Sequence, residues 1–176
     1  SGERIYRDHE LLGWAPKENV LLEKNLQSSK GRVYKSRYRT NFLGIREIEQ
    51  FDAKPGSIDT LKVLAIGDSF TGSNIASNED MWFGVIHRLS KGRLNMNAYG
   101  MGGSGTTQQY IAFKILRDVI DPDILLIQYC TNDPGNDSLR YGLLSILRNQ
   151  DLRRPYYKDG EFFFREDSAS KVYRFL

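Results

Sequence analysis

The sequence is short of the residues that would place it in several large classes of protein. A single cysteine, Cys130, excludes an internal disulfide and leaves the redox compartment open. No stretch approaches the roughly 18 apolar residues of a membrane span. The net charge of +3 comes from 25 basic and 22 acidic residues that are interspersed. No basic stripe or tail therefore indicates binding to nucleic acid.

Histidine is nearly as scarce, because only His9 and His87 occur. Apolar residues are plentiful: they make up 40% of the 176 positions, which fits one folded domain of ordinary size. Residues 1–56 are polar and aromatic without a sustained helical period, and this predicts an N-terminal extension of short strands and loops packed on a larger body. Its many Arg, Lys and Tyr residues favour a solvated surface, with a substrate groove as the alternative. Lys54-Pro55-Gly56 marks its boundary with the α/β unit, residues 57–176.

Strands and helices alternate regularly between residues 60 and 130. Apolar runs predict buried strands at 60–67, 94–99 and 124–130, and helical spacing predicts helices at 79–91 and 107–120. This order predicts a parallel sheet with right-handed crossovers. The expected buried helix faces leave His87 in solvent and consist of Trp82, Val85, Ile86 and Leu89 in the first helix and Tyr110, Ile111, Ile115, Leu116 and Val119 in the second.

Each predicted strand ends at a turn that carries chemically useful groups. The turns are Gly67-Asp68-Ser69, residues 100–105, and Thr131-Asn132-Asp133. The carboxyl ends of parallel strands meet at one edge of a sheet, where ligands bind in open α/β folds. A hydroxyl nucleophile, glycine N–H groups and an amide donor are what acyl transfer requires. A simpler interpretation stays open, in which Asp68 or Ser69 only caps the next helix.

A second alternative is a dinucleotide site. Gly100, Gly102 and Gly105 match G-x-G-x-x-G between a strand and a helix. The motif follows the second strand of the unit, however, and the acidic residue that should bind ribose is missing, because Asp121 and Asp123 precede the next strand. The pattern therefore argues against nucleotide binding.

In their order along the chain, the three turns resemble the first three sequence blocks of the SGNH, or GDSL-type, lipase and acylhydrolase family. Residues 63–69 resemble the block with the nucleophile, residues 97–106 the glycine block, and residues 130–133 the G-x-N-D block, with Cys130 in place of its glycine. Leu12-Gly13-Trp14 and residues 41–46 also look like the leader of a bacterial, often exported, branch. The resemblance implies a flavodoxin-like three-layer α/β/α fold with a parallel sheet, a location outside the cytoplasm or in the cell envelope, and neither cofactor nor metal.

The resemblance also assigns roles. It implies a serine esterase in which Ser69 attacks a short-chain or O-acetyl ester, with an acylated carbohydrate among the candidate substrates. The N–H groups of Ser69 and Gly103 and the side chain of Asn132 hold the oxyanion. Gly103 is chosen over Gly102 because the family's G-x-G-T pattern fits residues 103–106.

The family's general base has no counterpart in the sequence. The fourth signature is an Asp three residues before a His, and neither His9 nor His87 has an Asp at that position. Without a base the serine is a poor nucleophile. We therefore expect the front part of a longer esterase, incomplete at its C-terminal side and inactive alone, with the Asp-His pair downstream of Leu176. The alternative is a non-catalytic SGNH-like domain with a carbohydrate-binding or structural role.

Overall fold

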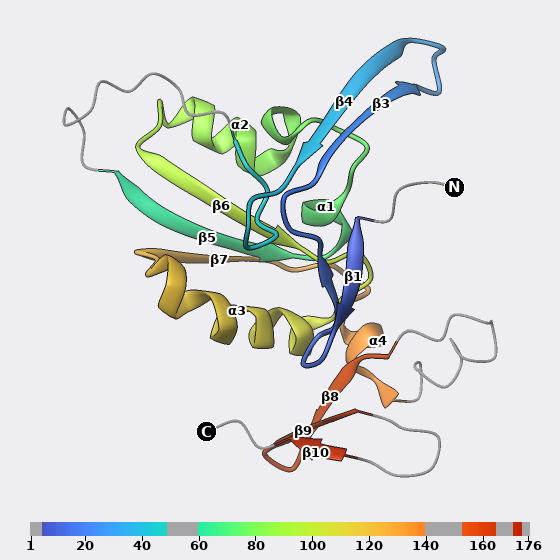
Figure 1. Ribbon diagram of the computed structural model, residues 1–176, viewed down its shortest axis with the longest axis vertical. Helices are drawn as coiled ribbons and strands as arrows, with labels where there is room; N and C mark the ends of the chain where they lie inside the picture. Colours follow the sequence, from blue (N-terminus) through green and yellow to red (C-terminus); the bar gives the residue numbers. More distant parts are fainter. Residues whose placement is uncertain (1–4, 49–59, 140–152, 165–170, 174–176) are drawn as a thin grey trace.

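A three-stranded parallel sheet lies at the centre of the computed structural model, which describes residues 5–48, 60–139, 153–164 and 171–173 (Figure 1). β5 (Leu61–Gly67) is the middle strand, with β6 (Leu94–Gly100) and β7 (Ile124–Gln128) on its two sides. The register pairs Gly67 with both Gly100 and Gln128, so the three strands end together. The predicted α/β class, parallel sheet and strand positions are confirmed.

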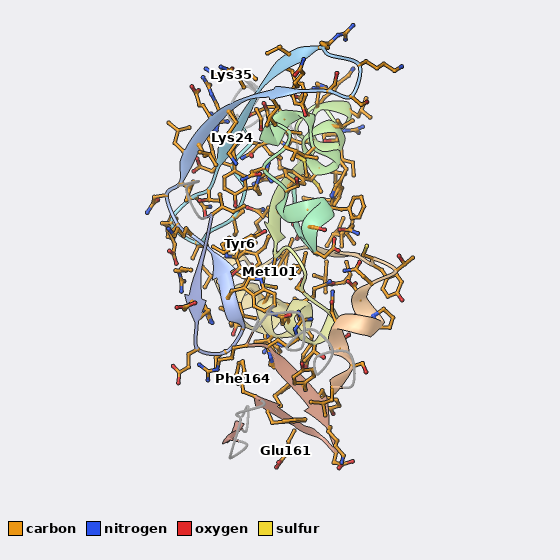
Figure 2. The ribbon with its side chains drawn as sticks, turned by 90° about the vertical axis from the view of Figure 1, so that its right-hand side faces the viewer. Tyr6, Lys24, Lys35, Met101, Glu161 and Phe164 are labelled. Atoms are coloured by element: carbon orange, nitrogen blue, oxygen red, sulfur yellow. The ribbon has the colours of Figure 1, made fainter. Side chains whose placement is uncertain are left out.

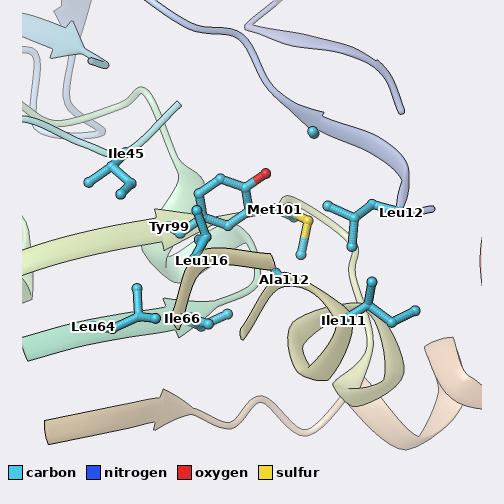
Figure 3. Close-up of a cluster of buried hydrophobic side chains, with 10 residues drawn as sticks. Leu12, Ile45, Leu64, Ile66, Tyr99, Met101, Ile111, Ala112 and Leu116 are labelled. Carbon is cyan, nitrogen blue, oxygen red and sulfur yellow. The ribbon is translucent and has the colours of Figure 1, made fainter. Parts of the chain in front are cut away.

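Helices cover both faces of this sheet (Figure 1). Side chains alternate along a strand, so Leu64 and Ile66 of β5 point to one face and Val63 and Ala65 to the other. The first pair packs against α3 (Thr106–Ile120), as Figure 3 shows. The second pair packs in a smaller cluster with Phe83 of α2 (Trp82–Leu89). Both predicted helices are confirmed in position.

The N-terminal segment forms two antiparallel hairpins, β1 (Tyr6–His9) with β2 (Gly13–Pro16) and β3 (Leu21–Gln27) with β4 (Val33–Arg39). The predicted short strands are confirmed, but the segment does more than coat the surface. Leu12 and Ile45 join the core beside α3 (Figure 3), and a bridge pairs Arg46 with Ala98 of β6. The predicted boundary at residues 54–56 lies outside the described residues.

The predicted helix faces are wrong in part. In α2 the buried residues are Phe83, Gly84 and His87, while Leu89 is 75% exposed. A separate 3-10 helix, η1 (Asn78–Asp80), precedes α2, and Gly84 sits where an added Cβ would clash with the backbone of residues 78–79. This close approach, rather than apolar spacing, fixes which side faces inward. In α3, Gln108 and Gln109 are buried, whereas Tyr110 and Val119 are exposed.

β7 is not the buried strand that its composition predicts. Ile124, Leu125 and Ile127 are each about two-fifths exposed, because β7 is an edge strand of the described sheet. After it come α4 (Asp133–Asp137) and a small antiparallel sheet of β8 (Pro155–Lys158), β9 (Glu161–Phe164) and β10 (Lys171–Tyr173). None of the described helices is long and apolar enough to cross a membrane.

Candidate active site

Ser69 is the first residue of α1 (Ser69–Gly72), directly after β5. The carboxylate of Asp68 is buried and accepts the Phe70 N–H at 2.9 Å, so Asp68 caps α1 as the simpler interpretation proposed. Ser69 itself is exposed, with its hydroxyl 3.4 Å from the second carboxylate oxygen of Asp68. Asp68 thus takes the capping role and leaves Ser69 open to a ligand.

Residues 101–105, which follow β6 and are called the glycine loop below, are held by hydrogen bonds to β5 and to β1. The Met101 N–H donates to the Gly67 carbonyl at 3.0 Å, which ties the loop to the end of β5. The Gly102 N–H donates to the Tyr6 hydroxyl at 2.8 Å. Gly103 has a φ of +74° with open space above its Cα, and its N–H makes no hydrogen bond to the described residues. Of the two glycines, Gly103 is therefore the one with a donor to offer.

The Tyr6 hydroxyl joins this loop to α1. Besides accepting from Gly102, it lies 3.4 Å from the Gly72 carbonyl at the end of α1 and donates to it. Burial raises the pKa of Tyr6, which keeps the hydroxyl protonated and able to donate. Figure 2 shows Tyr6 beside Met101. The sequence placed Tyr6 in a surface extension and gave no sign of this role.

The third turn is organised by Asp133, which is fully buried. One carboxylate oxygen accepts the Cys130 N–H and the Gln109 side-chain amide, both at 3.1 Å. Burial raises the pKa of Asp133. Asn132 is exposed, and its side-chain amide makes no hydrogen bond within the described chain. The buried Asp133 therefore holds the turn together by hydrogen bonds, while the exposed side chain of Asn132 can bind a ligand.

The second and third turns are also bound to each other. Asp137 of α4 accepts the N–H groups of Thr106 and Thr107 at 3.0 and 2.9 Å and so caps α3. Asn136 donates to the Ser104 carbonyl at 3.0 Å. Movement of the glycine loop relative to α4 would break these bonds, so the two turns form one rigid unit.

The sequence-predicted residues thus follow three adjacent strands at one edge of the sheet. Neighbouring strands are about 4.8 Å apart, so the two outer strand ends are about 10 Å from each other. The Ser69 N–H, the Gly103 N–H and the Asn132 amide share one property: none is used in a hydrogen bond within the described residues. Their convergence on a point about 3 Å from each donor stays a prediction.

Neither histidine offers an accepting nitrogen to Ser69. His87 is 6% exposed rather than solvated, and its Nδ1 donates to the carbonyl of Leu94 at 2.8 Å. Leu94 begins β6, about 20 Å along the strand from the edge where Ser69 lies. The Nδ1 of His9 accepts the N–H groups of Leu11 and Leu12 at 3.2 Å. Burial lowers the pKa of His9, which favours the neutral ring. Because Nδ1 accepts hydrogen bonds, the proton of the neutral ring is on Nε2, and Nε2 is therefore a donor and not a base.

Arg46 is a structural residue of the site that the sequence reasoning missed. Its guanidinium is buried and donates to the Asn78 side chain at 2.7 Å and to the carbonyls of Ser73 and Ala76 at 2.5 and 3.3 Å. It also lies 4.4 Å from the centre of the Tyr38 ring. Burial lowers the pKa of Arg46 to about 10. Arg46 fixes residues 73–78, the segment that follows α1.

Comparison of the chain with protein-family models, with curated proteins and with solved structures finds no match. Within the described residues, no group of three His, Cys, Asp or Glu side chains is arranged to hold a metal ion. The function is therefore argued from the three turns.

Proposed function

We propose that the protein is an SGNH-type serine esterase or acylhydrolase with a flavodoxin-like α/β/α fold, active outside the cytoplasm or in the cell envelope. One observation carries the proposal. Three turns at adjacent strand ends carry an exposed serine hydroxyl and three donors that make no hydrogen bond within the described residues. Donors that converge on one point would stabilise an oxyanion there.

In the proposed reaction, the Ser69 Oγ attacks the ester carbonyl carbon and the carbonyl oxygen takes up the negative charge. The N–H groups of Ser69 and Gly103 and the Asn132 amide bind this oxygen. The alcohol then leaves with a proton, and water hydrolyses the acyl-serine. One donor of this kind lowers the free energy of the transition state by about 3 kcal/mol. The base that takes the Ser69 proton belongs to an Asp-His pair that we place downstream of Leu176.

A non-catalytic domain with a carbohydrate-binding or structural role is the second candidate. The observation in its favour is the bonding of the two histidines: His87 is bound to Leu94 at the opposite end of β6, and the Nδ1 of His9 accepts two backbone N–H groups. An oxyanion hole without its base retains only a small part of the catalysis, because the members of a triad act as a unit.

Hydrolysis of a short-chain aryl ester separates the two candidates. We expect negligible activity from the 176-residue chain alone, and activity from the polypeptide extended by the downstream reading frame. Ser69→Ala should abolish that activity, whereas Ser28→Ala, in an exposed turn of the β3–β4 hairpin, should leave it unchanged.

Two outcomes would contradict the proposal. Equal rates from the short and the extended chain would place the base among residues 1–176. An extended chain that is inactive on a broad panel of esters would favour the non-catalytic domain.

A further inference from the structure

A groove of about 590 Å³ lies between the start of α3 and the β8–β9 hairpin. Its size falls within the usual range for sites that hold small ligands. None of the roles proposed above uses it. Its lining combines aromatic and polar side chains, and this combination indicates what the groove could bind.

The aromatic rings of the lining are both exposed and fixed. Tyr110 stacks on Phe162 with ring centres 6.0 Å apart and 22° between the planes, and Tyr157 packs against Phe162 at 5.0 Å. Tyr110 is nevertheless 48% exposed and Tyr157 58% exposed. Rings held in place before binding lose little freedom when a ligand packs on them.

Polar side chains of α3 and α4 complete the lining. Thr106 offers a hydroxyl, Lys114 an ammonium group and Asp137 a carboxylate. The carboxylate is fixed by the two N–H groups at the start of α3. One positive and one negative charge balance across the groove, which suits a ligand without net charge.

A sugar meets both requirements. Its C–H faces pack on aromatic rings, whose faces carry partial negative charge, and its hydroxyl groups both donate and accept hydrogen bonds. A lipid chain would offer no hydrogen bond to the Lys114 ammonium group, and a nucleic acid would need a basic lining.

The groove also adjoins the candidate oxyanion donors. Thr106 comes three residues after Gly103, so their Cα atoms are at most about 11 Å apart. We propose that the groove binds a neutral carbohydrate and presents an ester on that sugar to Ser69. The presentation step rests on the proposed function, whereas the binding step does not.

Calorimetric titration tests the binding step separately from catalysis. The probes are cellotetraose, maltotetraose and N-acetylated chitotetraose, added to the protein that carries Ser69→Ala. We expect saturable binding of at least one probe. Tyr157→Ala and Tyr110→Ala should each weaken it tenfold or more, while Tyr34→Ala, an exposed tyrosine on β4, should leave it within twofold. Thermal melting of each variant shows whether it is folded.

No binding of any probe up to about 10 mM, where even weak complexes of millimolar Kd would saturate, overturns the proposal. Binding that survives both groove substitutions in folded variants overturns it too. Failure of the proposed function looks different: Ser69→Ala would leave ester hydrolysis unchanged, while the sugar would still bind in the groove.

Discussion

Single hydrogen bonds determine which groups of the candidate site stay available to a ligand. Tyr6 uses the Gly102 N–H and leaves that of Gly103 unused, and Asp133 takes the Cys130 N–H while the Asn132 amide remains outside. The choice of Gly103 over Gly102, made on a sequence pattern, stays a prediction. The sequence pattern could locate these turn residues because each turn directly follows a strand that the apolar runs predict.

Asn132→Ala should lower kcat for ester hydrolysis by the extended polypeptide roughly 10²- to 10³-fold, as loss of one oxyanion donor does. Because Asn132 is exposed and its amide is unused within the described chain, the melting temperature should hardly change. Steady-state kinetics and thermal melting measure the two effects. Asn25→Ala, at an exposed position of β3, is the control, and an equal loss in both variants would exclude the assigned role.

Asp133→Asn should change how stability depends on pH. Burial raises the pKa of Asp133 above its ordinary 3.8, so the folded state holds this proton more tightly than the unfolded chain. The stabilisation is present below pH 4 and is lost as the pH rises through the folded pKa. The melting temperature of the variant minus that of the native protein should therefore be higher at pH 7 than at pH 4. A difference that is constant with pH would contradict this.

At the scale of helices and strands, positions were predictable and orientations were not. The strands at 60–67, 94–99 and 124–130 and the helix at 107–120 follow from local apolar patterns. The inward face of α2 depends instead on the contact of Gly84 with residues 78–79, which no periodicity reveals. The error on His87 has the same origin, since its partner is the Leu94 carbonyl of the next strand.

Tyr6→Phe should loosen the link between α1 and the glycine loop. The substitution keeps the ring and removes the hydroxyl that accepts from Gly102 and donates to Gly72. We expect a loss of about 1 kcal/mol in the free energy of unfolding, the usual net value of a hydrogen bond. Urea denaturation measures it. Tyr34→Phe, on the exposed β4, is the matched control, and equal stability of the two variants would contradict the link.

For the whole molecule, the order of strands and helices was enough to predict the sheet, because parallel strands joined by helices have few alternative arrangements. The surroundings of the sheet were not predictable in this way. Residues of the N-terminal segment, such as Leu12 and Ile45, complete the core beside α3, although their own sequence looks like that of a surface extension. Contacts between residues so far apart in the sequence cannot be recognised from the pattern of either segment alone.

The apolar edge of β7 should make the protein self-associate. Leu125 and Ile127 are 41% and 42% exposed on a strand that lies at the edge of the sheet formed by the described residues, and edge strands pair readily with other chains. Leu125→Thr combined with Ile127→Thr should lower the apparent mass in light scattering at high concentration. Leu89→Thr, at a 75% exposed position of α2, should not. Equal masses for both variants would show that the β7 edge is not the contact.

The hydrogen bond between Tyr6 and Gly102 joins residues 96 positions apart, and so does the bond from the Gln108 side chain to the Leu12 carbonyl. Contacts of such long sequence separation form late in folding, since a large loop must close before they can be made. On the ribosome, the β1–β2 hairpin emerges first, but it cannot make these two hydrogen bonds until the glycine loop and α3 have been synthesised. The glycine loop reaches its final geometry only after this closure, so nascent chains acquire the complete site at the end of folding.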